Sequence, residues 1–130
     1  MNKTVSASGS TELSLILARM NQDGNFLISV LTDRNGFPIA SATASGEDPD
    51  LQSAVVALVQ KTAAQVQQQL DMAPTDEISI FDTAGRRLVC RPFTANEHQL
   101  ILAVLIPTRH QSYRRLTNTA VRAIQRQWKL

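Results

Sequence analysis

The apolar and polar positions along the chain divide it into five short strands and three helices. Residues 26–32 and 100–106 are apolar on both faces, which is typical of strands in the centre of a sheet that is covered on both sides. The second of these runs belongs to a strand that we expect to span residues 98–106. The segments 37–43, 77–81 and 87–93 mix apolar with polar positions and predict three further strands.

The order of these strands follows from their composition and from the short turns between them. Pro38 cannot donate a backbone hydrogen bond, so the second strand should lie at an edge or begin at its very end. The two apolar strands, first and fifth, should be neighbours in the middle, and hairpins join second to first and fourth to both third and fifth. We therefore predict an α+β fold, a three-layer α/β/α sandwich with a five-stranded antiparallel sheet of order 2-1-5-4-3.

Apolar residues at helical spacing predict helices at both ends of the chain. The first should run from about Ser10 to Asn21, with Ser10 or Thr11 as its N-cap. We expect Thr108 to cap the last helix, which is amphipathic. Its apolar stripe consists of Tyr113, Leu116, Ala120, Ile124 and Trp128. Its opposite face is basic and carries Arg115, Arg122, Arg126 and Lys129.

The longest predicted helix follows the motif Asp48-Pro49-Asp50, a strong helix start, and should end near Asp71. Its apolar stripe consists of Leu51, Val55, Leu58, Thr62, Val66 and Leu70, widened by Val56, Val59 and Ala63. The remaining surface is rich in glutamine and almost uncharged, whereas a solvated helix normally carries more charge. This composition suits contact with another protein, and we predict Gln52, Gln60 and Gln67 as partner-binding residues. The alternative is a solvated helix that happens to be rich in glutamine.

No catalytic or cofactor motif stands out in the sequence. Asp82-Thr83-Ala84-Gly85 has the spelling of a magnesium-binding motif of small GTPases, but the phosphate-binding loop of a GTPase is missing. The same segment lies between two predicted strands, as Asp33-Arg34-Asn35-Gly36 does, so turn formation explains both. His98, His110 and the single cysteine, Cys90, lack metal-ligand spacing. We expect no enzyme activity, no metal and no cofactor.

Length and composition indicate one domain. The chain has 130 residues, of which 43% are hydrophobic and 5% aromatic. We expect a polar N-terminal tail over residues 1–9 and a single domain over residues 10–130. No apolar run approaches the roughly 20 residues that span a bilayer, and the N-terminus lacks the apolar core of a signal peptide. These features favour a cytoplasmic protein without membrane insertion.

Charge is distributed unevenly along the chain. Residues 1–83 carry four basic and ten acidic side chains, whereas residues 84–130 carry nine basic side chains and one acidic one. Such asymmetry indicates an acidic partner, a self-complementary dimer or an anionic polymer. The basic last helix would suit phosphate contacts, but Tyr113 and Trp128 fall on its apolar stripe and leave no stacking platform, so we predict no nucleic-acid binding.

The order of these features resembles the Roadblock family, with its profilin-like architecture. The resemblance includes Phe26–Ser41, in which a strand ends in Asp-x-x-Gly and an Ile-Ala-Ser strand follows, together with the long helix after Asp48. Residues 81–89 and the apolar run 100–106 are similar to the later strands of that family. The resemblance covers nearly the whole chain, roughly Leu13 to Trp128.

The resemblance implies a noncatalytic homodimer. Roadblock domains usually pair through their third strands, edge to edge, and pack their second helices antiparallel. The expected dimer interface consists of Val56, Val59, Ala63, Glu77, Ile78, Ser79, Ile80 and Phe81. In this interpretation Phe81, an apolar ring on the wetter face of its strand, is covered by a second copy.

The sequence is compatible with three functional hypotheses. The resemblance favours an adaptor that binds a small Ras-like GTPase and regulates it in the manner of a GTPase-activating protein. The alternative is a structural scaffold that docks an acidic protein through Arg115, Arg122 and Arg126. A small-molecule sensor would need a deep polar pocket, for which the sequence offers no sign.

Overall fold

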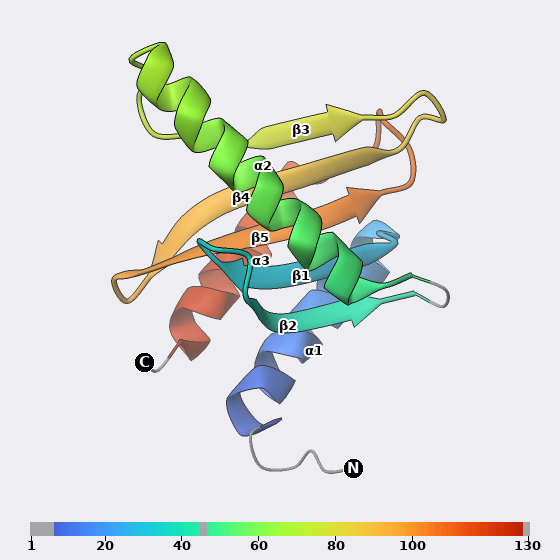
Figure 1. Ribbon diagram of the computed structural model, residues 1–130. Coiled ribbons are helices and arrows are strands. Elements are labelled where there is room, and N and C mark those ends of the chain that lie inside the picture. Colours follow the sequence, from blue (N-terminus) through green and yellow to red (C-terminus); the bar gives the residue numbers. More distant parts are fainter. Residues whose placement is uncertain (1–6, 45–46, 129–130) are drawn as a thin grey trace.

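The five strands form one antiparallel sheet of order β2-β1-β5-β4-β3 in the computed structural model, which describes residues 7–44 and 47–128 (Figure 1). This confirms the predicted order. The strands are β1 (Ile28–Asp33), β2 (Pro38–Thr43), β3 (Ile78–Phe81), β4 (Arg87–Ala95) and β5 (His98–Ile106). The helices are α1 (Ala7–Gly24), α2 (Pro49–Gln69) and α3 (Arg114–Gln127). Pro38 begins the edge strand β2, where its missing N–H interrupts no ladder.

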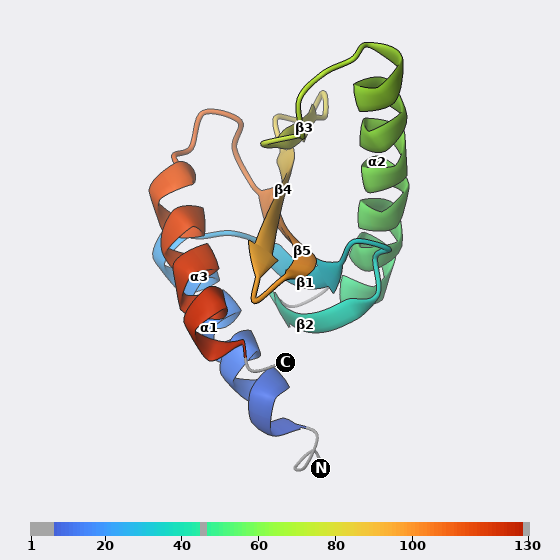
Figure 2. The ribbon, with the colours of Figure 1, turned by 90° about the vertical axis from the view of Figure 1, so that its left-hand side faces the viewer.

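The helices lie on both faces of the sheet and complete the predicted three layers. Figure 2 shows α2 alone on one face, with α1 and α3 together on the other. The strands β1 and β5, which are buried almost throughout, lie side by side in the sheet centre. Their apolar composition on both faces is explained by these two layers of helices.

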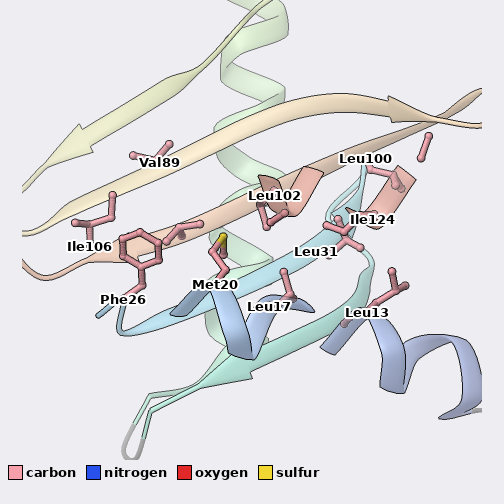
Figure 3. Packing of buried hydrophobic residues seen from close by; sticks show 14 residues of the cluster. Leu13, Leu17, Met20, Phe26, Leu31, Val89, Leu100, Leu102, Ile106 and Ile124 are labelled. Atoms are coloured by element: carbon pink, nitrogen blue, oxygen red, sulfur yellow. The ribbon is translucent and has the colours of Figure 1, made fainter. Parts of the chain in front are cut away.

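The larger core lies between the sheet and the pair α1 and α3. Figure 3 shows Leu17 and Met20 of α1 close to Leu31 and Leu102 of the sheet. Ile124 of α3 is fully buried in the same cluster. The core beneath α2 is smaller and consists of Val30, Val56, Cys90, Ile101 and Ala103. The core under α2 therefore contains fewer buried side chains than the core on the opposite face of the sheet.

Both Asp-x-x-Gly segments form turns, as predicted. The carboxylate Oδ1 of Asp33 accepts hydrogen bonds from the backbone N–H groups of Asn35 and Phe37 at 2.8 and 3.0 Å. In the second turn, Oδ1 of Asp82 accepts one from the backbone N–H of Arg86 at 2.7 Å. Side-chain oxygens thus satisfy backbone donors that the turn leaves without partners.

The helix boundaries differ from the predictions at several ends. Helix α1 begins at Ala7, so Ser10 and Thr11 lie inside it and neither is its N-cap. Residues 7–9, predicted as part of the polar tail, are helical, and residues 1–6 of that tail lie outside the described residues. The polar composition of this segment did not prevent helix formation, because apolar residues further along α1 pack on the sheet.

Helix α3 begins at Arg114, and its N-cap is Tyr113, which makes no side-chain capping bond. The hydroxyl of Thr108, the predicted cap, donates instead to Oε1 of Gln111 at 3.1 Å. Helix α2 begins at Pro49 as predicted, and Oδ1 of Asp48 accepts from the N–H of Asp50 at 3.0 Å. It ends at Gln69, two residues early, and Asp71 has a φ of 54° beyond it.

Candidate interaction surfaces

Helix α2 turns its apolar stripe away from the sheet, which the sequence did not indicate. The side chain of Val56 is fully buried in the core beneath the helix, and Gln52 and Ser53 are buried beside it. Leu58 and Leu70, by contrast, are 65% and 68% exposed. The sequence left open which side of the helix contacts the sheet, and in the structure the side with the smaller side chains does so. The side chain of Leu51 lies outside the described residues.

The exposed apolar stripe of α2 consists of Val55, Leu58, Thr62, Val66 and Leu70. Near it, β3 forms one end of the sheet, and in the described part of the chain it pairs with β4 alone. On this strand Ile80 and Phe81 are 46% and 45% exposed, whereas Ile78 packs against the core beneath α2. An unpaired strand edge beside apolar side chains is a surface that favours pairing with another chain.

The predicted dimer residues fall into three groups in this arrangement. Ile80 and Phe81 are exposed beside the open edge, and Val59, Ala63, Ile78 and Ser79 are half-buried. Val56 is enclosed by its own protomer, so its side chain is not available to a partner. Glu77 and Ser79 have hydrogen-bond partners within the chain, described below.

Phe81 is also contacted by its own chain. The guanidinium carbon of Arg87 lies 4.8 Å from the centre of the Phe81 ring and 4.4 Å from that of Tyr113. The guanidinium of Arg109 lies 4.6 Å from the Phe81 ring. These cation–π contacts explain an aromatic ring on the polar side of a strand without any second copy. Phe81 and Arg87 are partners across the predicted hairpin, whereas Tyr113 and Arg109 lie far from it in the sequence, so no local pattern indicates their contacts.

Glu77 connects β3 to α3 through a network of hydrogen bonds. Its carboxylate accepts from the hydroxyl of Tyr113, from Ser79 at 3.0 Å and from Arg114 at 2.6 Å, and Arg87 lies 3.3 Å away. Burial alone would raise the pKa of Glu77, but these donors outweigh burial and lower it. The edge strand is therefore held to the last helix by charged and polar contacts.

The predicted basic face of α3 is exposed. Arg115, Arg122 and Arg126 make no ion pair with any described residue, whereas Arg114 pairs with Asp76 and Glu77. Lys129 lies outside the described residues. Three unpaired guanidinium groups on one helix are consistent with an acidic binding partner.

The predicted partner-binding glutamines lie in different places. Gln52, in the first turn of α2, is buried on the side that faces the sheet, and its Nε2 has no hydrogen-bond partner among the described residues. Gln60 and Gln67 line an open cleft of about 790 Å³ between α2, the first hairpin turn and the strands β4 and β5. No sequence signal locates this cleft, since its walls are far apart along the chain.

The described residues offer little for a catalytic site. Cys90 is buried, and burial raises the pKa of its thiol to about 12, which makes the thiolate inaccessible near neutral pH. In residues 7–44 and 47–128, no three His, Cys, Asp or Glu side chains gather in a group that could bind a metal ion. None of the three helices, over the described residues, combines the length and apolar character that crossing a membrane requires.

Known proteins resemble this chain in structure and not in sequence. No protein-family model and no curated protein matches it significantly. Myxococcus xanthus MglB matches with a TM-score of 0.75 at 16% identity, over 100% of this chain and 97% of the other. The gliding protein MglB from Thermus thermophilus matches with a TM-score of 0.71 at 19% identity, over 92% of this chain and 90% of the other.

A Roadblock/LC7 domain from Streptomyces avermitilis is similar as well. It matches with a TM-score of 0.64 at 18% identity, over 88% of this chain and 93% of that domain. At such identities the likeness concerns the fold. It extends along nearly the whole length of both chains, so it includes the sheet and the helices on both of its faces.

Proposed function

We propose that this chain, which has the Roadblock/LC7 fold, is a noncatalytic homodimeric adaptor of the cytoplasm that binds and regulates a small Ras-like GTPase. The observation that carries the proposal is the exposed apolar stripe of α2 near the unpaired edge of β3. A protein that left both surfaces in solvent would risk aggregation through them. Association of two copies would cover both at once.

In the proposed dimer, β3 pairs with β3 of a second copy and the two α2 stripes pack against each other. Val66 and Leu58 of α2 and Ile80 of β3 would then be buried, and Val56 would remain inside its own protomer. Oligomers occur among proteins of this fold: one solved MglB structure, similar with a TM-score of 0.73 at 17% identity, has a tetrameric arrangement.

The proposal of a GTPase partner is based on the fold and on the resemblance to Roadblock regulators. A surface composed of two copies is larger than either copy alone offers, which suits the recognition of a globular protein. Regulation would then act on the partner's own active site, with this chain as a positioning surface. In this proposal the chain contributes contacts and no catalytic side chain.

The dimer is tested by light scattering at micromolar concentration. We expect the mass of two chains for the wild type and of one chain for Val66→Glu, because a carboxylate cannot be buried unpaired in an apolar contact. Gln68→Glu is the matched control, since Gln68 is exposed and lies about 160° around the helix from Val66, on the flank opposite the stripe. A monomeric wild type, or equal masses for both variants, would refute the dimer.

The partner is tested by pulldown against the small GTPase encoded nearest to the gene, loaded with GTP or with GDP. We expect retention of at least one form and a changed rate of GTP hydrolysis. Val66→Glu should weaken both effects if the dimer is the binding unit. Absence of binding to either form would remove this proposal while leaving the dimer intact.

The exposed arginines of α3 support a second candidate, a scaffold that docks an acidic protein. Arg115, Arg122 and Arg126 lie on the layer opposite α2 and have no partner among the described residues. Changing all three to glutamate should abolish such docking and leave the dimer unchanged. If GTPase binding were lost instead, the basic face would belong to the GTPase site.

A further inference from the structure

The two flanks of α2 have different surfaces. At about 100° per residue, Val55, Thr62 and Val66 lie on one side of the buried Val56, and Gln60 and Ala64 lie on the other. The first flank carries the apolar stripe. The second flank forms a wall of the open cleft. An occupant of this cleft would therefore not compete with the proposed dimer contact.

The cleft has an apolar floor and walls rich in amide groups. Pro92 of β4 and Ile101 of β5, which pair across the two strands, contribute to the floor, whereas the side chains of Phe93 and Leu100 pack on the opposite face of the sheet. The glutamines at its surface are Gln60, Gln67, Gln68 and Gln99. Its volume of about 790 Å³ lies within the range of sites that bind ligands, although the cleft is open to solvent along its length.

The amide groups of the cleft have no hydrogen-bond partners within the described chain. Oε1 of Gln60 is buried and unpaired, and the side chains of Gln67, Gln68 and Gln99 make no hydrogen bond. Gln125, outside the cleft, donates to the carbonyl of Thr94 at 2.9 Å. A buried acceptor without a partner is unfavourable, so Oε1 of Gln60 needs a donor from outside the chain, which water or a bound group in the open cleft can supply.

A peptide backbone offers the groups that these side chains need. Each amide side chain has both a donor and an acceptor, and so does each peptide unit. The wall from Gln60 to Asp71 is about 16 Å long at 1.5 Å per residue, which an extended peptide of about five residues would span. The apolar floor would receive side chains from one face of such a peptide.

The ends of the cleft carry opposite charges. Arg34 lies in the first hairpin turn, which touches α2 at Ser53 and Ala57, and Asp71 follows the other end of the helix. Neither charged side chain has an ion-pair partner among the described residues. An occupant with an acidic residue at one end and a basic residue at the other would match them.

We propose that this cleft binds an extended segment of about five residues from a partner protein, held by the unpaired glutamine amides, with an acidic residue at Arg34 and a basic residue at Asp71. The segment has an apolar residue between these charges. The site does not depend on the proposed dimer or on a GTPase, because it occupies the other flank of α2.

The test uses a phage-displayed library of random peptides, selected on the full-length protein. Enriched peptides should carry an acidic and a basic residue on either side of an apolar one. Binding of the synthesised peptides is measured by fluorescence anisotropy, and amide shifts in NMR should map to residues 60–72 and 92–101. No enrichment, or shifts confined to the apolar stripe or to α3, would overturn the proposal.

Ala64→Trp should fill the cleft and weaken peptide binding at least about tenfold, which corresponds to about 1.4 kcal/mol. Gln65→Trp is the matched control, because Gln65 lies beyond the cleft, and it should bind as the wild type does. Methylation of the peptide's backbone nitrogens should weaken binding similarly, since it removes the donors for the glutamines. Equal binding by both tryptophan variants, or no effect of methylation, would refute the site.

A second variant covers the case in which Ala64→Trp does not fold. Arg34→Glu in an exposed turn should weaken the selected peptides, and replacing their acidic residue by lysine should restore binding. If the lysine-substituted peptide does not bind Arg34→Glu better than the original peptide does, the acidic residue of the peptide does not lie at Arg34. Val66→Glu should retain peptide binding, so failure of the dimer or of GTPase binding is distinguishable from failure of this site.

Discussion

Gly36 determines how closely the first hairpin approaches α2. Its φ of +87° is a left-handed conformation that other residues adopt at a cost. A Cβ added there would lie 2.4 Å from Cβ of Ala57 and 3.0 Å from its Cα. Gly85, in the corresponding second turn, has a φ of +94° but no atom within 4 Å of such a Cβ. Both glycines have a positive φ, but only Gly36 is in close contact with another element. Comparing the two positions therefore separates the cost of the backbone conformation from the cost of the contact with Ala57.

We expect Gly36→Ala to lower the free energy of unfolding by about 2–4 kcal/mol, combining backbone strain with overpacking against α2. Gly85→Ala should lower it by only about 1 kcal/mol, because strain acts there alone. Urea unfolding followed by circular dichroism measures both. Equal losses would show that the contact between Gly36 and Ala57 contributes nothing.

Glu77 makes the stability of the edge strand depend on pH. Its pKa is lowered in the folded state, although burial acts in the opposite direction, because Tyr113, Ser79 and Arg114 donate to the carboxylate. A lowered pKa means that the folded state binds its proton less readily than the unfolded state. The stabilisation is therefore complete above the ordinary glutamate pKa of about 4.3 and is lost as the pH falls through the lowered value.

Glu77→Gln should thus destabilise the protein at neutral pH, and the difference from the wild type should shrink as the pH falls below about 4. Urea unfolding at a series of pH values measures the difference. Glu97→Gln is the control, because Glu97 is exposed and has no ion pair with a described residue. A difference for Glu77→Gln that does not change with pH would contradict the assigned role of the carboxylate.

Among the elements, α2 has an orientation that leaves its most apolar side exposed. This helix packs on β1 and β2 through Val56 and its neighbours, and the stripe with the larger apolar side chains faces away. Gly36 and Ala57, both small, allow the hairpin and helix to come together on the inner side. The side of α2 that contacts the sheet is therefore the less apolar one, and its small side chains let the backbones of the hairpin and the helix lie close together.

We expect Val56→Ala to lower the free energy of unfolding by about 1–3 kcal/mol at any protein concentration, because it leaves a cavity in the core of one protomer. Leu58→Ala should have almost no effect at low concentration, since Leu58 is largely exposed and alanine favours the helix. Its effect should grow with protein concentration if the stripe is buried between copies. Unfolding at two concentrations distinguishes these outcomes, and a large, concentration-independent loss for Leu58→Ala would contradict the orientation.

For the molecule as a whole, the three layers separate three surfaces. The α2 layer carries the apolar stripe on one flank and the amide-lined cleft on the other. The opposite layer carries the unpaired arginines of α3. Asp76 and Glu77 pair with Arg114, and Glu77 also with Arg87, so Arg115, Arg122 and Arg126 of α3 have no ion pair with a described residue. The proposed dimer contact therefore overlaps neither the proposed peptide cleft nor the basic face of α3.

The strand order and the turns are determined locally enough to be predicted from sequence. A strand that is apolar on both faces must lie where both faces are covered, a proline must avoid the interior ladder, and short turns leave neighbouring strands adjacent. These constraints leave one sheet order, 2-1-5-4-3, and the structure has it. Asp33 and Asp48 could be placed for the same reason, since the carboxylate of each accepts from backbone N–H groups within four residues of itself. Gly36 could be placed because the turn requires a positive φ.

The side of α2 that faces the sheet was decided only in the tertiary structure. Periodicity identifies an apolar stripe but not its contact, because a helix with alanine and valine on several sides has more than one face that can pack. The same limit applies to the contact of Arg87 with Tyr113 and to the glutamine-lined cleft. Each joins residues from separate elements, and their contact energies depend on distances that no local sequence pattern encodes.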